Sequence, residues 1–303
     1  MSSLPSFSQP GLSWKACLLL TIPLFAWGAN YPLMKLAIAA MPPLMFTAFR
    51  LWGAAIVLAV ISLASGARPL LLPLPEERRP LAVVGLLQIG AMLGLTIIGL
   101  SAVPAGRTAL LVYTMPLWSV PIARWVLGEQ INMRKLAGVL TGLVGVLFFF
   151  NPLVVDWSDT HTLAGCSLIL LGSIGWAYGS CLYRKKRWRS TVVVQTLWQL
   201  LIASIPIAAL SLATENINAV DIGFRLVAIL AYNWVIATAL SMWCWNRALE
   251  TMTVSTAGQF LLFTPLVGFV LSVLFLGETA PGALLVSAVL ILLGLLITIR
   301  AER

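Results

Sequence analysis

Apolar runs follow one another from one end of this chain to the other, and they constrain the fold more than any other feature. In a helix, roughly 20 residues cross the ~30 Å hydrocarbon core of a bilayer. Lipid offers no partners to backbone N–H and C=O groups, so runs this long and this evenly apolar favour helices over barrel strands. Breaks at Pro, Gly and charged clusters predict helices near residues 15–35, 43–65, 80–100, 104–127, 134–150, 163–183, 191–212, 225–247, 254–276 and 281–300. The chain is therefore predicted to be an all-α membrane protein with ten transmembrane helices.

Composition agrees with lipid as the main solvent. Hydrophobic residues make up 60% of the 303 residues and charged residues only 10%, which is too little polar surface for a water-soluble globule. The first apolar run lacks a basic leader and an Ala-x-Ala cleavage site, so we expect a retained helix rather than a signal peptide. The dispersed cysteines show neither metal-ligand nor disulfide spacing. They are Cys17, Cys166, Cys181 and Cys244. The sequence predicts no metal site and no cofactor.

The basic residues indicate topology rather than a nucleic-acid partner. The net charge of +9 would favour nucleic acid in a soluble protein, but here the basic residues lie mostly in short connections. With a cytoplasmic N-terminus, fifteen of the nineteen Lys and Arg residues fall on the inner side. The outer four are Lys35, Arg50, Arg107 and Arg225. This bias predicts a membrane protein with both termini in the cytoplasm. Arg50 and Arg107 are expected to snorkel at the outer face, with contact to an anion as the alternative.

The chain also repeats itself at an offset of 149 residues. This offset places Leu127-Gly128-Glu129 on Leu276-Gly277-Glu278 and Pro116 on Pro265. It also pairs Trp27 with Trp176 and Gly145 with Gly294. No gap is needed, which predicts two halves, residues 1–155 and 156–303. Each half holds an odd number of predicted helices, so the second half must be inverted in the membrane. Inverted halves favour a carrier that works by alternating access over a passive channel, which does not require them.

The fourth and ninth predicted helices each carry a proline, end in Leu-Gly-Glu and lead to a Gly-containing helix. In these features the chain resembles the EamA-type transporters of the drug/metabolite transporter superfamily, and the resemblance covers nearly the whole chain. It is similar to bacterial members that export amino acids, including aromatic ones, and the resemblance implies a place in the bacterial inner membrane. The resemblance implies a central cavity lined by helices 1, 3, 4, 6, 8 and 9, with helices 5 and 10 at the periphery or an interface. The expected partners are a small-molecule substrate and the lipid bilayer, with a monomer as the working state.

Polar side chains inside a membrane are costly unless they face a partner or an aqueous cavity. The mid-helix polar and aromatic residues are therefore the predicted substrate contacts. They are Trp27, Asn30, Tyr31, Gln88, Tyr113, Trp176, Ser180, Tyr183, Asn233 and Gln259. Pro116 and Pro265 each remove a backbone donor and leave the carbonyl four residues earlier, Val112 or Leu261, without its helical partner. A hinge beside the substrate and a static bend are both consistent with such kinks.

Aromatic and amide side chains favour uncharged or zwitterionic cargo, chiefly amino acids with large apolar or aromatic side chains. No acidic residue is expected at mid-membrane, which disfavours a buried proton relay. Glu129 and Glu278 are expected mainly to satisfy backbone donors of the next helix, and a drug/proton antiporter that uses them is one alternative. A passive channel is another. An enzyme is disfavoured because the sole histidine, His161, falls in a predicted outer loop with no metal-ligand motif or nucleophile dyad.

Overall fold

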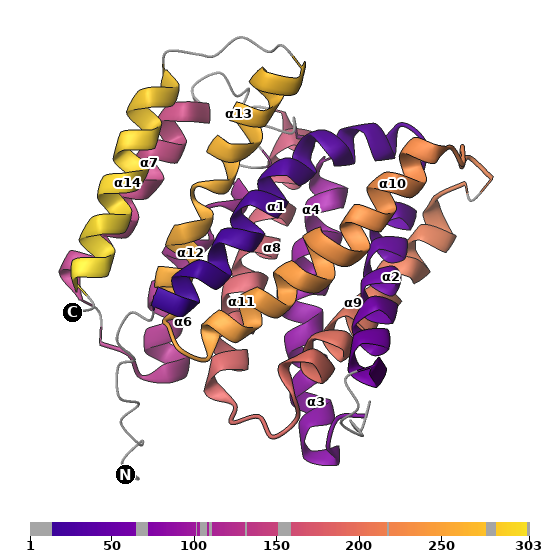
Figure 1. Ribbon diagram of the computed structural model, residues 1–303. Helices are drawn as coiled ribbons and strands as arrows, with labels where there is room; N and C mark the ends of the chain where they lie inside the picture. The colour runs from indigo at the N-terminus through magenta and orange to yellow at the C-terminus, as the bar shows by residue number, and fades with distance from the viewer. Residues whose placement is uncertain are drawn as a thin grey trace.

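The computed structural model describes residues 14–64, 72–100, 102–103, 108, 111–130, 132–150, 159–216, 218–276 and 283–301. Within these ranges every regular element is helical and there is no strand (Figure 1). Five helical segments are long and apolar enough to cross a membrane, and shorter apolar helices accompany them. The five are Pro43–Ala64, Pro75–Leu100, Thr160–Lys185, Val192–Thr214 and Phe224–Leu249. The prediction of an all-helical chain of the membrane type is confirmed in the described residues.

The elements of the first half are α1 (Trp14–Ile38), α2 (Pro43–Ala64), α3 (Pro75–Val84), η1 (Gly85–Ala91), α4 (Met92–Leu100), α6 (Met115–Leu127) and α7 (Met133–Phe150). Those of the second half are α8 (Thr160–Lys185), α9 (Val192–Thr214), α10 (Phe224–Tyr232), η3 (Asn233–Leu240), α11 (Ser241–Leu249), α12 (Val254–Leu261), α13 (Thr264–Leu276) and α14 (Ala283–Ala301). The elements η1 and η3 are π-helical turns that join α3 to α4 and α10 to α11 without a break. Such turns are rare and concentrate at functional sites.

Carboxylates and hydroxyls fix where several helices begin, because the first N–H groups of a helix have no intrahelical acceptor. Asp159 accepts hydrogen bonds from the first turn of α8, and Thr191 does so for α9. A distant residue serves α2: the Glu215 carboxylate accepts from the backbone N–H groups of Leu44 and Met45 at 2.7 and 2.8 Å. This contact ties the connection after α9 to the start of α2.

Two predicted helices are interrupted just before their prolines. The chain turns at residues 113–114 and again at 262–263, positions that are 149 residues apart. Pro116 and Pro265 are each the second residue of the helix that follows, α6 or α13. At that position the missing N–H has no intrahelical partner to lose. The structure therefore has a helix break at each site where the sequence predicted a kinked but continuous helix.

The packing of the helices relates the two halves of the chain. Helix α1 packs on α11 and α13, and its repeat equivalent α8 packs on α4 and α6. Helices α2 and α9, which are also equivalent, pack on each other, as do α7 and α14. The α7/α14 pair, the fifth and tenth predicted helices, lies along one edge of the bundle (Figure 1). It crosses at glycines: a Cβ added to Gly294 would lie 2.5 Å from the carbonyl oxygen of Gly138.

The first Leu-Gly-Glu motif ends α6. Gly128 adopts a left-handed conformation with φ of 71°, which favours glycine, and its N–H bonds back to the last turn of α6. The Glu129 carboxylate forms an ion pair with Arg184 at the end of α8. Glu129 thereby links the two halves of the chain. Gly277 and Glu278 of the second motif lie outside the described residues.

Candidate functional site

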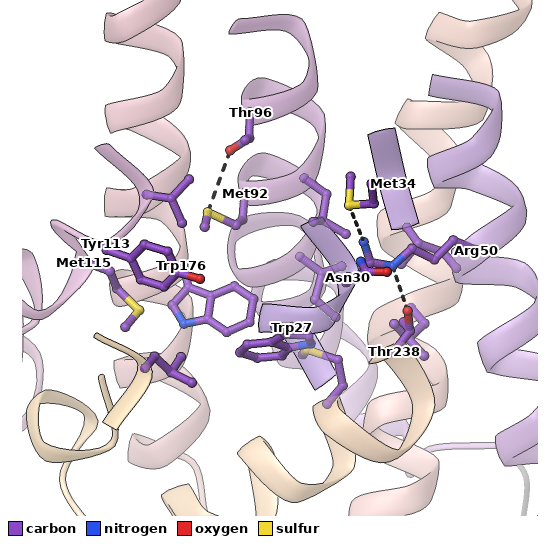
Figure 2. A pocket seen from close by; sticks show the side chains of 17 residues that line it. Trp27, Asn30, Met34, Arg50, Met92, Thr96, Tyr113, Met115, Trp176 and Thr238 are labelled. Carbon is purple, nitrogen blue, oxygen red and sulfur yellow. Dashed lines mark hydrogen bonds between the residues drawn. The ribbon is translucent and has the colours of Figure 1, made fainter. Parts of the chain in front are cut away.

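A cavity of about 160 Å³ lies between the two halves of the chain (Figure 2). Helix α1 lines it with Trp27, Asn30 and Met34, and the other helices add Arg50, Leu51, Ile89, Met92, Leu93, Thr96, Val112, Tyr113, Met115, Trp176, Leu200, Thr238, Met242 and Leu261. The helices implied by the family resemblance all contribute. Helices α2 and α9, the second and seventh of the prediction, contribute as well.

Tryptophan side chains form the most compact part of the cavity wall. The rings of Trp27 and Trp176 meet edge to face, with centroids 5.7 Å apart and an interplanar angle of 84°, a favoured aromatic geometry. Trp245 is fully buried behind them and lies 5.4 Å from Trp176. Trp27 Nε1 donates to the carbonyl of Ala237 in η3 at 2.7 Å. This bond holds the ring against the π-helical turn of the other half.

Much of the cavity lining consists of residues that are equivalent under the 149-residue offset. Five such pairs contribute both members, so ten of the seventeen lining residues are paired. The pairs are Trp27 with Trp176, Leu51 with Leu200, Ile89 with Thr238, Leu93 with Met242 and Val112 with Leu261. The two halves therefore face the cavity with corresponding surfaces, and the cavity lies where the two repeats meet.

The helix break before α6 borders the cavity. The backbone carbonyl to which Pro116 cannot donate accepts a hydrogen bond from another helix instead. Val112 lies four residues before Pro116, which cannot donate to it. The hydroxyl of Ser173, on α8, donates to the Val112 carbonyl at 3.1 Å. A side chain of the second half thus stabilises the interrupted helix of the first half, next to Tyr113 in the cavity wall.

Only some of the sequence-predicted site residues meet in this cavity. Trp27, Asn30, Tyr113 and Trp176 line it. Gln88 and Ser180 do not line it. Instead, Gln88 Nε2 donates to Ser180 Oγ at 3.1 Å, between η1 and α8. Pro116 and Pro265 begin helices and are not in the lining.

Three more predicted contacts also lie away from the cavity. The Tyr183 hydroxyl donates to Gln195 Oε1 at 2.5 Å, and Asn233 Nδ2 donates to the Ile229 carbonyl at 3.0 Å. Gln259 is fully buried in α12 and does not line the cavity. The bonds of Tyr183 and Asn233 lie within the helix bundle, and residue type alone does not distinguish that role from ligand contact. The side chain of Tyr31 lies outside the described residues.

Arg50 is a cavity residue that the sequence reasoning missed. Its side chain is only 7% exposed, so the expected snorkelling to the outer face is wrong for Arg50. Its Nε donates to Thr238 Oγ1 at 2.7 Å, and its Nη1 lies 3.9 Å from Met34 Sδ. The position of Arg50 in the predicted helix could have identified it as a cavity residue, because it lies two turns inside α2, on the buried rather than the lipid-facing side. Arg107 lies outside the described residues.

The comparison with family models matches this arrangement of two similar halves. The model of the EamA-like transporter family matches the chain twice, at residues 14–151 and 163–300. The chain belongs to the EamA-like transporter family. The second match is displaced from the first by the same 149 residues that relate the equivalent motifs and cavity residues. The family predicted from the paired prolines and Leu-Gly-Glu motifs is thereby confirmed.

Relatives of this EamA-like transporter are similar over nearly their whole length. The uncharacterized transporter YoaV of Bacillus subtilis is 26% identical over 89% of this chain and 91% of its own. A probable amino-acid metabolite efflux pump of Escherichia coli is 27% identical over 95% of this chain and 96% of its own. One crystal structure superposes with a TM-score of 0.79 at 20% identity, over 93% of this chain and 96% of that one, which supports the fold alone.

Proposed function

We propose that this chain is a carrier of the bacterial inner membrane that exports small metabolites, chiefly amino acids including aromatic ones, by alternating access. The observation that carries the proposal is the cavity lined by five pairs of equivalent residues from the two repeats. When two similar halves surround one site, an exchange of their conformations opens that site to either side of the membrane.

In this proposal the chain forms ten transmembrane helices in two inverted halves, residues 1–155 and 156–303, with both termini in the cytoplasm. The equivalent packing of α1 and α8, and the equivalent breaks at 113–114 and 262–263, support related halves. The basic connection at 184–189 supports the inversion, because its counterpart after α1 carries almost no charge. The breaks beside Pro116 and Pro265 are the proposed hinges, and Pro116 follows directly on the cavity wall.

The orientation is testable by labelling single cysteines from outside intact cells, in a variant without the native cysteines. Arg187→Cys and Asn218→Cys place probes at exposed positions on the two sides that the charge bias predicts. We expect an impermeant maleimide to label Asn218→Cys in intact cells and to label Arg187→Cys only after permeabilisation. The reverse pattern would place the termini outside.

The cargo is testable with purified protein in liposomes, by uptake of labelled phenylalanine with and without a pH gradient. We expect saturable uptake without a gradient. Trp176→Ala is expected to raise the half-saturation concentration about two- to twelvefold, since an aromatic pair contributes ~0.5–1.5 kcal/mol. Trp14→Ala is the matched control, because Trp14 is 67% exposed at the start of α1. Uptake that never saturates would indicate a channel, and movement of a cationic dye alone, driven by the gradient, would indicate a drug/proton antiporter.

A further inference from the structure

Three polar side chains of the cavity, Arg50, Asn30 and Thr238, gather at one end of it (Figure 2). Arg50 is 93% buried, and its guanidinium contacts Thr238 from η3 and Met34 from α1. Asn30 lies one helical turn before Met34 on α1, and it is 4% exposed. Its Oδ1 has no hydrogen-bond partner among the described residues. A buried cation and a free amide acceptor thus share one end of the cavity.

The opposite end is aromatic and apolar. In Figure 2, Arg50, Asn30 and Thr238 lie to one side of Trp27, while Trp176, Tyr113 and Met115 lie to the other. No Asp or Glu is among the described residues that line the cavity. The cavity therefore presents positive charge at one end and aromatic faces at the other.

The other half of the chain does not repeat the polar side chains of this end. The equivalent of Arg50 is Gln199, which accepts a hydrogen bond from Asn246 and does not line the cavity. The equivalent of Thr238 is Ile89, and that of Asn30 is Gly179, against which Gln88 packs. A buried charge is costly in a membrane interior and is kept there for a partner or a function. Packing symmetry does not explain it here.

We infer that Arg50 selects the cargo by its carboxylate, with Asn30 Oδ1 accepting from the ammonium group and the apolar side chain directed toward Trp27 and Trp176. This inference rests on the proposed function and names the part of the cargo that the cavity recognises. A guanidinium offers paired N–H donors that match a carboxylate in geometry and charge. The same charge repels an amine that lacks a carboxylate.

The first test uses the unchanged protein in liposomes and compares competitors of labelled phenylalanine uptake. We expect 3-phenylpropionate, which keeps the carboxylate, to compete at least about tenfold better than 2-phenylethylamine, which keeps only the amine. Equal competition by the two compounds overturns the assignment of Arg50 and leaves the proposed function intact. No phenylalanine uptake at all overturns the proposed function itself.

The second test changes the charge. Arg50→Gln is expected to raise the half-inhibition concentration of 3-phenylpropionate roughly ten- to hundredfold and to change that of 2-phenylethylamine little. Arg225→Gln removes the same charge from an exposed position outside the cavity and is expected to change neither. Arg50→Lys keeps the charge without the planar donor pair, so an intermediate value is expected. Equal weakening of both competitors by Arg50→Gln, in protein that melts at the normal temperature, would show a structural role and refute the inference.

Discussion

Replacement of Gly294 by alanine tests the close crossing of α7 and α14. The added Cβ would lie 2.5 Å from the Gly138 carbonyl oxygen and 2.5 Å from the Gly142 backbone nitrogen. Both atoms belong to the backbone of α7, so neither moves aside as a flexible side chain would. Since real Cβ contacts below 3.0 Å essentially do not occur, α7 and α14 must separate by at least about 0.5 Å along the crossing.

That separation has a definite energetic cost. A radial gap of ~0.5–1 Å forfeits roughly a quarter to a half of each dispersion contact, and overpacking typically costs ~1–3 kcal/mol. Close approach through small residues is a main source of helix association in lipid, where the hydrophobic effect does not drive it. At roughly 2–4 °C for each kcal/mol, we expect the melting temperature in detergent to fall by about 2–12 °C.

The assay is thermal unfolding of the purified variant, with phenylalanine uptake measured in parallel. Gly94→Ala is the matched control, because its Cβ would meet only the side chain of Ile207, at 3.5 Å. No described residue of α7 or α14 lines the cavity, so the half-saturation concentration should stay unchanged in Gly294→Ala. An unchanged melting temperature would refute the close crossing of α7 and α14. A changed half-saturation concentration at an unchanged melting temperature would refute the conclusion that this helix pair lies apart from the cavity.

Three further outcomes follow from single contacts. Glu215→Ala leaves two N–H groups at the start of α2 without their acceptors and should cost ~1–2 kcal/mol in thermal unfolding; the exposed Asp221→Asn should cost nothing measurable. Ser173→Ala removes the donor to the Val112 carbonyl beside the cavity, so we expect a loss of ~1 kcal/mol and a changed uptake rate; equal effects from Ser167→Ala, which bonds only within α8, would contradict this. N-ethylmaleimide, followed by mass spectrometry, should leave the buried thiols unlabelled until the protein is denatured. These are Cys166, Cys181 and Cys244.

Local sequence patterns predicted the helices and the positions where they are disturbed. Unbroken apolar runs require helices, because backbone groups have no other partner in lipid. Proline fixes the breaks at 113–114 and 262–263, since it lacks an N–H and begins a new helix easily. The π-helical turns η1 and η3 were not predicted, because nothing in their residue types distinguishes them from ordinary apolar helix.

The candidate site was predicted in part. Trp27 and Trp176 were identified because they are equivalent aromatic residues, and equivalent positions of a repeat meet at its axis. Gln88, Ser180 and Tyr183 were predicted from polarity and helical spacing, yet Gln88 Nε2 donates to Ser180 and the Tyr183 hydroxyl donates to Gln195, both away from the cavity. Polarity in a membrane requires a partner, but the sequence does not tell whether that partner is a ligand or another helix.

The sequence by itself determined the helical class, the two-fold repeat and the family, because periodic apolar runs and spaced motifs are properties of the chain order. Only the tertiary structure decided which of the polar residues face the cavity. Arg50 illustrates the difference: along the chain it stands near a predicted membrane surface, but in the fold the rotation of α2 turns it toward α1 and η3. That rotation depends on how α2 packs against α9 and η3, and therefore on contacts between residues about 150 to 190 positions apart.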